Sequence, residues 1–259
     1  MGIHFGISQM IAYLGMYLLV WRTGADISAY YQQAMLLTGL TGLLAMLPCL
    51  YFYKKDHDRR IAGGLVPQRG SRLTLWEWPM FLIVGAFLGQ YGNLFVSLFQ
   101  KYLNPESYQQ TQSAVMAGKS LWSMIFWMGI VAPLAEEVIF RWLVYLRMRD
   151  NMKVAAAAIL SGLLFGIYHM NLVQGVYASL MGTLFALLME WRGNLFTSVL
   201  LHMGANIWSL VGTQCMQYML EPQDGIWLTV LNVALILIGV AGIVKCKKDY
   251  DKRSGRRLI

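Results

Sequence analysis

Charge is scarce in this sequence of 259 residues: only 13% of them are charged, whereas 57% are hydrophobic. A soluble domain carries about twice that charged fraction, so the composition argues against a soluble protein. Cysteine is scarce as well: Cys49 falls in an apolar run, Cys215 in a predicted loop and Cys246 among lysines. An odd and scattered set of three excludes a disulfide framework.

What the sequence has instead is long apolar runs. A helix needs roughly 17 to 25 such residues to cross about 30 Å of hydrocarbon. Eight runs approach or meet this length, at residues 5–21, 34–53, 76–99, 118–147, 154–171, 174–190, 194–212 and 226–244. They leave no room for a second folded unit. The sequence therefore predicts an all-α, polytopic membrane protein with about eight transmembrane helices in a single membrane-embedded domain, residues 1–259.

The positive charge is distributed unevenly along the chain. The net charge of +8 could indicate nucleic-acid binding, but the basic residues sit beside apolar runs, so we expect no nucleic-acid partner and expect contact with the lipid bilayer instead. If both termini are cytoplasmic, 18 of the 21 Lys and Arg residues fall on the cytoplasmic side, seven of them in a basic tail, residues 245–259. Positively charged loops stay cytoplasmic, so this bias predicts an N-in, C-in protein of the cell membrane.

Few ionisable side chains lie deep in the apolar runs. All the Asp residues fall in loops or tails, and the deep groups are Glu136, Glu137, His169 and His202. Inserting a charged side chain at the bilayer centre costs about 2.5–3.5 kcal/mol of free energy. We therefore expect each of these groups to have a functional or structural role. At about 1.5 Å of rise per residue, Glu136, His202 and His169 lie roughly 17, 15 and 24 Å from the cytoplasmic side. These depths are counted from the basic residues at the helix ends, which are Arg147, Arg192 and Lys153, respectively. We therefore expect them to meet in one pocket within the membrane.

The spacing of neighbouring residues supports such a pocket. Arg141 follows Glu137 by four residues, so the two share a helix face and can form a charge-assisted hydrogen bond. Asn206 likewise follows His202 by four, where its amide could orient the ring or bind a substrate carbonyl.

Two further residues would shape the pocket. Phe165 precedes His169 by four and could wall the pocket. Pro133 removes a backbone hydrogen bond and predicts a kink just before the glutamate pair.

Several hydrolytic chemistries are excluded by what is missing. No His is followed by Glu, so no HExxH zinc motif is present, and no Asp pair is buried. No serine lies in a recognisable nucleophile motif. Water activated by carboxylate and imidazole remains, either directly or on a Zn²⁺ ion held by Glu136, His169 and His202. The residues themselves leave both mechanisms open.

Three strings carry a family resemblance. Glu136-Glu137-Val138-Ile139-Phe140-Arg141, Phe165-Gly166-Ile167-Tyr168-His169 and His202-Met203-Gly204-Ala205-Asn206 resemble, in order, the motifs EExxxR, FxxxH and HxxxN of the CAAX protease and bacteriocin-processing family, also called Abi proteins. The likeness covers residues 118–212.

The resemblance implies an intramembrane endopeptidase with a cavity open to the cytoplasm. By this resemblance Glu136 would activate the water with help from His169, His202 and Asn206 would form the oxyanion site, and Glu137 and Arg141 would support it.

Three functions follow as hypotheses. The first is an endopeptidase that cleaves a membrane-associated peptide or protein near the cytoplasmic face; family members remove the last three residues of prenylated proteins or are linked to peptide maturation and bacteriocin immunity. The alternative is a non-catalytic immunity or scaffold protein with the same fold. A third is a proton-coupled transporter, which buried Glu and His could serve, although the sequence has no internal repeat.

Overall fold

The computed structural model describes residues 2–24, 27–64, 72–98, 116–219 and 225–255, together with the isolated residues Glu106, Gln110 and Ser113. These residues form helices and no strands, in agreement with the predicted all-α class. Each predicted run corresponds to one helix: α1 (Gly2–Thr23), α2 (Ile27–Ala62), α3 (Glu77–Ser97), a continuous helix Leu121–Arg149, α8 (Val154–Tyr168), α9 (Leu172–Arg192), α10 (Phe196–Met219) and α11 (Gly225–Gly255).

Five helices are long and apolar enough to cross a membrane by length and composition: Gln33–Ala62, Glu77–Ser97, Leu121–Arg149, Leu172–Arg192 and Gly225–Ser254. Helix α8 is shorter than its predicted run. Its 15 residues span about 22 Å, less than the hydrocarbon thickness of about 30 Å. The helix ends at Tyr168, and His169 to Asn171 form a turn in which Met170 has φ 53°. Helix α8 therefore forms a hairpin with α9, and by length it is shorter than a helix that crosses the hydrocarbon.

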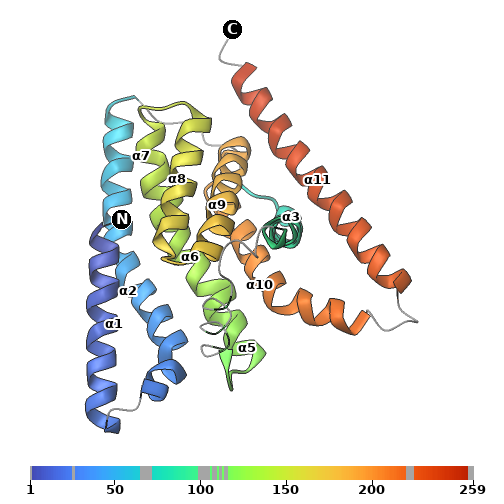
Figure 1. The fold of residues 1–259 in the computed structure, drawn as a ribbon. Helices are drawn as coiled ribbons and strands as arrows, with labels where there is room; N and C mark the ends of the chain where they lie inside the picture. Colours follow the sequence, from blue (N-terminus) through green and yellow to red (C-terminus); the bar gives the residue numbers. More distant parts are fainter. Residues whose placement is uncertain are drawn as a thin grey trace.

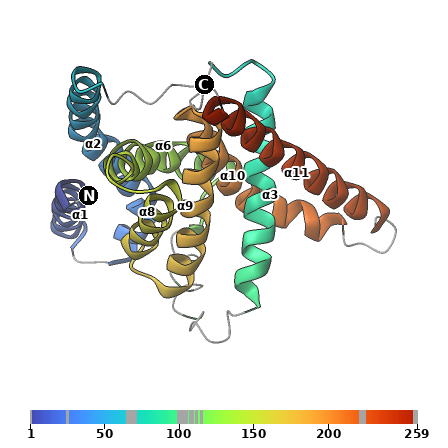
Figure 2. The same cartoon turned by 90° about the horizontal axis from the view of Figure 1, so that it is seen from above.

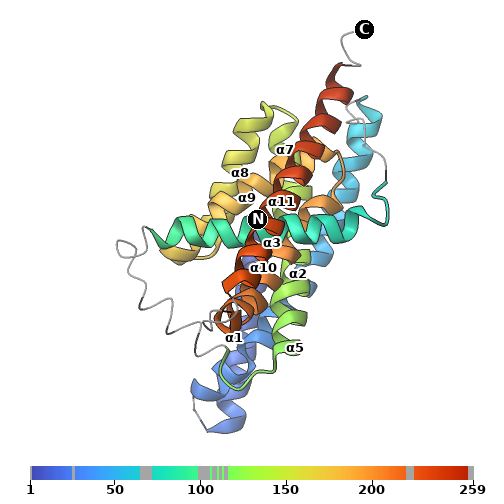
Figure 3. The same ribbon diagram turned by 90° about the vertical axis from the view of Figure 1, so that its right-hand side faces the viewer.

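Helix α3 lies across the other helices. It is seen end-on in Figure 1 and along its length in Figure 3, whereas α8 and α9 run up and down in both views. Its crossing with α10 is very close, since a Cβ atom on Gly85 would overlap the carbonyl oxygen of Leu201, and one on Gly204 would overlap that of Leu82. Glycine permits this approach of two helix backbones. The crossing fixes the part of α10 that carries His202 and Asn206.

The helix Leu121–Arg149 contains two π-helical segments between its α-helical parts. It consists of α5 (Leu121–Met124), η2 (Ile125–Val131), α6 (Ala132–Glu137), η3 (Val138–Tyr145) and α7 (Leu146–Arg149), where η2 and η3 are π-helical. Such π-helical turns close i→i+5 hydrogen bonds, are rare, and often occur at functional sites. The kink predicted at Pro133 stays a prediction, and what the structure shows is π-helical winding on both sides of α6, the segment that contains Pro133.

The helices are arranged in a row when seen from above. Helices α1 and α2 lie at one edge, α3 and α11 at the other, and α6, α8, α9 and α10 between them (Figure 2). Buried apolar clusters hold this row together: Phe140, Phe165 and Val199 lie in one, and Phe81, Phe185 and Leu201 in another. The interior groups of the site are thus surrounded by helices on both sides.

Ion pairs join the helices at the end where α2, α7 and the start of α8 meet (Figure 1). Arg60 binds Asp150 at 2.8 Å, and Arg147 pairs with Asp56. Arg192 contacts Glu77 at 2.8 Å, where Lys245 also reaches at 2.9 Å. Many of the basic residues assigned to the cytoplasmic side thus serve as interhelical contacts.

The basic tail differs from the prediction. Helix α11 continues to Gly255, Cys246 is buried, and Arg253 donates hydrogen bonds to the carbonyls of Glu190, Trp191 and Arg192. A cation at the negative end of the α9 dipole is favourable, so the segment up to Gly255 is docked rather than free. The predicted tail residues 256–259 lie outside the described residues.

Two other sequence predictions need correction. Cys215 lies within α10, which continues to Met219, and not in a loop. Arg141, counted among the 18 residues of the cytoplasmic side, is completely buried in the interior. A positive charge can be kept there because Glu137 lies beside it, a pairing that the count of charges alone does not distinguish from a surface position.

Candidate active site

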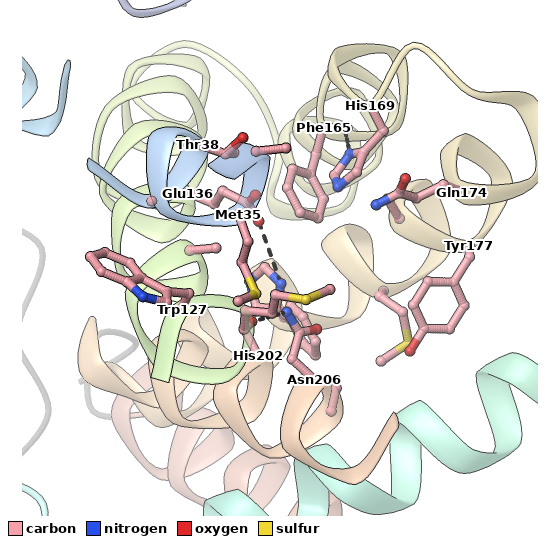
Figure 4. A pocket seen from close by; sticks show the side chains of 18 residues that line it. Met35, Thr38, Trp127, Glu136, Phe165, His169, Gln174, Tyr177, His202 and Asn206 are labelled. Atoms are coloured by element: carbon pink, nitrogen blue, oxygen red, sulfur yellow. Dashed lines mark hydrogen bonds and ion pairs between the residues drawn. The ribbon is translucent and has the colours of Figure 1, made fainter. Parts of the chain in front are cut away.

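A cavity of about 260 Å³ lies among α2, η2, α6, α8, α9 and α10. Figure 4 shows Glu136, His169, His202 and Asn206 directed into it from three helical segments: α6, the end of α8, and α10. Phe165 also lines it, whereas Glu137 and Arg141 lie behind its wall, where both are completely buried. The structure thus gathers the predicted residues in two layers around one space.

His202 lies between the two glutamates. Its Nδ1 atom is 2.9 Å from Oε1 of Glu137, and its Nε2 atom is 3.6 Å from Oε2 of Glu136. An ionised carboxylate only accepts hydrogen bonds, so Nδ1 of His202 donates to Glu137. In the neutral ring this leaves the lone pair on Nε2, directed toward Glu136. The pair Glu136–His202 can therefore hold or exchange one proton.

Glu137 is fixed from its other side by Arg141. The Arg141 Nε atom lies 3.2 Å from Oε2 of Glu137, and both side chains have no exposed surface. The contact is an ion pair, but the predicted hydrogen bond is not formed, because neither Nε nor Oε2 has an aligned partner. The change from α6 to the wider η3 turn between these residues rotates them relative to each other.

The Arg141 guanidinium is held by aromatic rings instead. It lies 4.6 Å from the centre of the Phe165 ring and 5.8 Å from that of Phe185. Desolvated cation–π contacts of this kind are worth about 2 kcal/mol. Arg141 also lies close to Gly182, where a Cβ atom would be 2.9 Å from Nη2. The charge that keeps Glu137 ionised is thus sandwiched between helices α8 and α9.

His169 stands apart from the glutamates. Its Nδ1 atom is 2.8 Å from the carbonyl oxygen of Phe165, so Nδ1 donates and the Nε2 atom carries the lone pair. The Phe165 ring packs against both imidazoles, with centroid distances of 4.7 Å to His169 and 5.6 Å to His202. Phe165 is therefore a wall of the site, and the imidazole beside Glu136 is that of His202, not of His169.

Asn206 is held by the π-helical segment. The N–H of Ala132 donates to the carbonyl of Trp127, five residues back, and the next N–H in this pattern would come from Pro133, which has none. The carbonyl of Met128 thus lacks its helical donor, and Nδ2 of Asn206 donates to it at 2.9 Å. Pro133 in this way sets the position of Asn206, which keeps a second Nδ2 hydrogen for the cavity.

The residues suggested for Zn²⁺ are not gathered as a metal-type cluster in the described part of the chain. A tetrahedral zinc ion requires its ligands at about 2.0–2.2 Å, and Glu136, His169 and His202 would have to converge on one point. In the described part of the chain no group of three or more His, Cys, Asp or Glu side chains is arranged to hold a metal ion. The Nδ1 atom of His169 is engaged by the Phe165 carbonyl, which leaves its Nε2 atom for the cavity, and the mechanism below involves no metal.

The cavity also contains residues that the sequence did not single out. They come mainly from α2, η2 and the first half of α9: Met35, Thr38, Trp127, Met128, Gln174, Tyr177 and Met181. Met35 and Thr38 resemble any residue of an apolar helix, so no local signal marks them. Gln174 does carry one, because an amide five residues after His169 in an apolar run requires a partner.

One comparison with known proteins gives a match. Residues 118–208 match the family model of Rce1-like type II CAAX prenyl endopeptidases. The match confirms the predicted resemblance and includes Glu136, Glu137, His169, His202 and Asn206, within about a third of the chain. In comparisons with curated proteins and with solved structures, nothing matched.

Proposed function

We propose that this chain is a membrane-embedded peptidase that hydrolyses a peptide bond by water bound between Glu136 and the substrate carbonyl. One observation carries the proposal: His202 lies at a cavity wall between two carboxylates, 2.9 Å from one and 3.6 Å from the other. The matched family, whose name specifies an endopeptidase, supports the same class of reaction.

The proposed reaction moves one proton in a closed path. Glu136 takes a proton from the water as its oxygen adds to the carbonyl carbon. The proton can pass to Nε2 of His202, where Glu137 stabilises the imidazolium ion. It then returns through Glu136 to the amine nitrogen as the carbon–nitrogen bond breaks. The products are a carboxylic acid, which keeps the second hydrogen of the water, and a free amine; the acid then releases this proton to solvent and becomes a carboxylate.

Other groups stabilise the charges that develop. The second Nδ2 hydrogen of Asn206 can donate to the oxyanion of the tetrahedral intermediate, because Met128 already fixes the amide. The Nε2 lone pair of His169 can accept a hydrogen bond from the water. This assigns His202 to proton transfer with Glu136, whereas the family resemblance alone suggested His169 for that role.

The proposed substrate is a membrane-associated peptide or protein segment, with a prenylated C-terminus as the first type to test because of the matched family's name. On this proposal the protein lies in the cell membrane with both termini cytoplasmic. The ion pairs of Arg60, Arg147 and Arg192 at one end of the molecule are compatible with that orientation.

Cleavage by purified protein tests the proposal. We expect the wild type in detergent to cleave members of a peptide set offered with and without a C-terminal prenyl group. Glu136→Gln should lower kcat by about 10²–10⁴-fold because it removes the general base, while Glu106→Gln, at an exposed position, should leave it unchanged.

Two other outcomes would redirect the proposal. If a chelator abolishes cleavage and zinc restores it, the metal-free roles above are wrong. If the wild type cleaves no peptide but binds one equally well with Glu136 or Gln at position 136, the chain is a non-catalytic binding protein.

A further inference from the structure

Gln174 has a place in the cavity wall to which the reaction assigns no role. It lies in the first turn of α9, where its backbone N–H binds Oδ1 of Asn171 at 3.1 Å. Figure 4 shows its side chain directed into the cavity, between His169 and Tyr177. Its backbone is thus anchored while its amide faces the space that a substrate would fill.

The amide of Gln174 differs from the other site groups because they already have partners. His202 binds Glu137, His169 binds the Phe165 carbonyl, and Asn206 binds the Met128 carbonyl. For the side-chain amide of Gln174 no hydrogen bond is present among the described residues. Gln174 is half-buried, so its amide can still reach water in the open cavity. A ligand that fills the cavity displaces this water and binds well only if it replaces the lost hydrogen bonds.

The chemistry of that ligand follows from the amide. A glutamine side chain offers an acceptor oxygen and two N–H donors in one plane. A peptide group presents a donor N–H and an acceptor C=O, so an extended segment can pair with Gln174 through its main chain alone. Such pairing holds a peptide without selecting its side chains.

The selection of side chains falls to the rest of α9. Tyr177, Met181 and Phe185 follow Gln174 on the same helix face and line the cavity as far as His202, whose ring lies 5.2 Å from that of Phe185. Met181 is unbranched and polarisable, so it adapts to different apolar groups. The wall therefore favours a peptide with apolar side chains.

We propose that Gln174 binds the main chain of the substrate at a peptide group next to the scissile bond, and that the substrate is an extended peptide with apolar side chains against α9. The proposal rests on the proposed peptidase function and specifies its substrate. Gln174 is then a positioning residue whose loss weakens substrate binding more than it slows the chemical step.

The test combines a protein variant with altered peptides. Gln174→Met keeps the length of the side chain and removes the amide. Gln33→Met makes the same change at an exposed residue of α2 outside the cavity. Each protein is given a peptide that the wild type cleaves, and analogues in which one amide near the scissile bond is replaced by an ester, which removes a donor N–H.

We expect one ester analogue to raise the KM of the wild type and of Gln33→Met by about tenfold, because it loses one good hydrogen bond to Gln174. The kcat of both proteins should change little. Gln174→Met should show the raised KM with the all-amide peptide already and no further rise with that ester. Unchanged accumulation in membranes and an unchanged unfolding midpoint would show that the variant folds.

The failing outcomes are distinguishable. A wild-type KM for Gln174→Met with the all-amide peptide, or an ester penalty that persists in this variant, overturns the role of Gln174 and leaves the peptidase intact. Absence of cleavage by the wild type with every peptide overturns the proposed function and this inference together.

Discussion

The two histidines of the cavity occupy contrasting surroundings. His202 is 5% exposed and sits between two carboxylates, with a buried arginine behind one of them. His169 is half-buried at the end of a short helix, and its Nδ1 atom binds a backbone carbonyl. Phe165 packs against both rings. One side of the site is thus organised by buried charge and the other by the turn between two helices.

The different surroundings of the two histidines indicate that the two sides of the site have different roles. Charges that are fixed before the reaction stabilise a transition state without reorganisation, and the His202 side has this property because Glu137 and Arg141 cannot move into water. The His169 side has fewer constraints and carries the unpaired amide of Gln174. We therefore assign proton transfer to the His202 side and substrate positioning to the His169 side.

The largest effect is expected for the buried ion pair of Glu137 and Arg141, which distinguishes the surroundings of His202 from those of His169. Arg141→Met leaves the Glu137 carboxylate buried without its cation, so we expect a loss of about 3–5 kcal/mol in the free energy of unfolding. The measurement is denaturant or thermal unfolding in detergent. Combining Arg141→Met with Glu137→Gln should recover part of the loss, because no uncompensated charge remains. A double variant less stable than Arg141→Met would contradict this account of the pair.

The two histidines can then be compared directly. His202→Gln should lower kcat by about 100-fold and also reduce the free energy of unfolding by about 1–3 kcal/mol, since Glu137 loses a buried donor. His169→Gln should lower kcat but change stability by no more than about 0.5 kcal/mol. Peptide cleavage and unfolding of both variants provide the measurement. Equal losses of stability would show that the two surroundings do not differ as described.

The last comparison concerns the coupling between Asn206 and Pro133. Asn206→Leu leaves the Met128 carbonyl without a donor and should cost about 1–3 kcal/mol of stability. Pro133→Ala supplies the missing N–H, so Asn206→Leu should cost less in that background. Unfolding of the four proteins of this cycle measures the coupling. Additive losses would show that Pro133 and Asn206 act independently.

Much of the fold was predictable because apolar length determines a membrane helix. All eight predicted runs became helices, and residues 76–99 and 174–190 matched α3 and α9 within a few residues. Hydropathy, however, does not show how a helix is oriented relative to its neighbours, so it did not reveal that α3 lies across the other helices. The close glycine contacts of Gly85 and Gly204 with facing carbonyls determine that crossing, and these contacts exist only in three dimensions.

The members of the site were predictable, but its pairings were only partly so. The cost of burying a charge identified Glu136, Glu137, His169 and His202. Four-residue spacing linked Glu137 with Arg141, which do form an ion pair at 3.2 Å, but without the predicted hydrogen bond, because η3 begins between them. Spacing within α10 could not reveal the partner of Asn206, because that partner is a backbone carbonyl of η2.

The most direct test of the central claim, that Glu136 and His202 transfer one proton as a unit, is the cleavage rate of Glu136→Gln, His202→Gln and the double variant. The account predicts that the double variant is no slower than the slower single variant, because either change already interrupts the same path. Rate losses that multiply in the double variant would contradict it and show that the two residues act in separate steps.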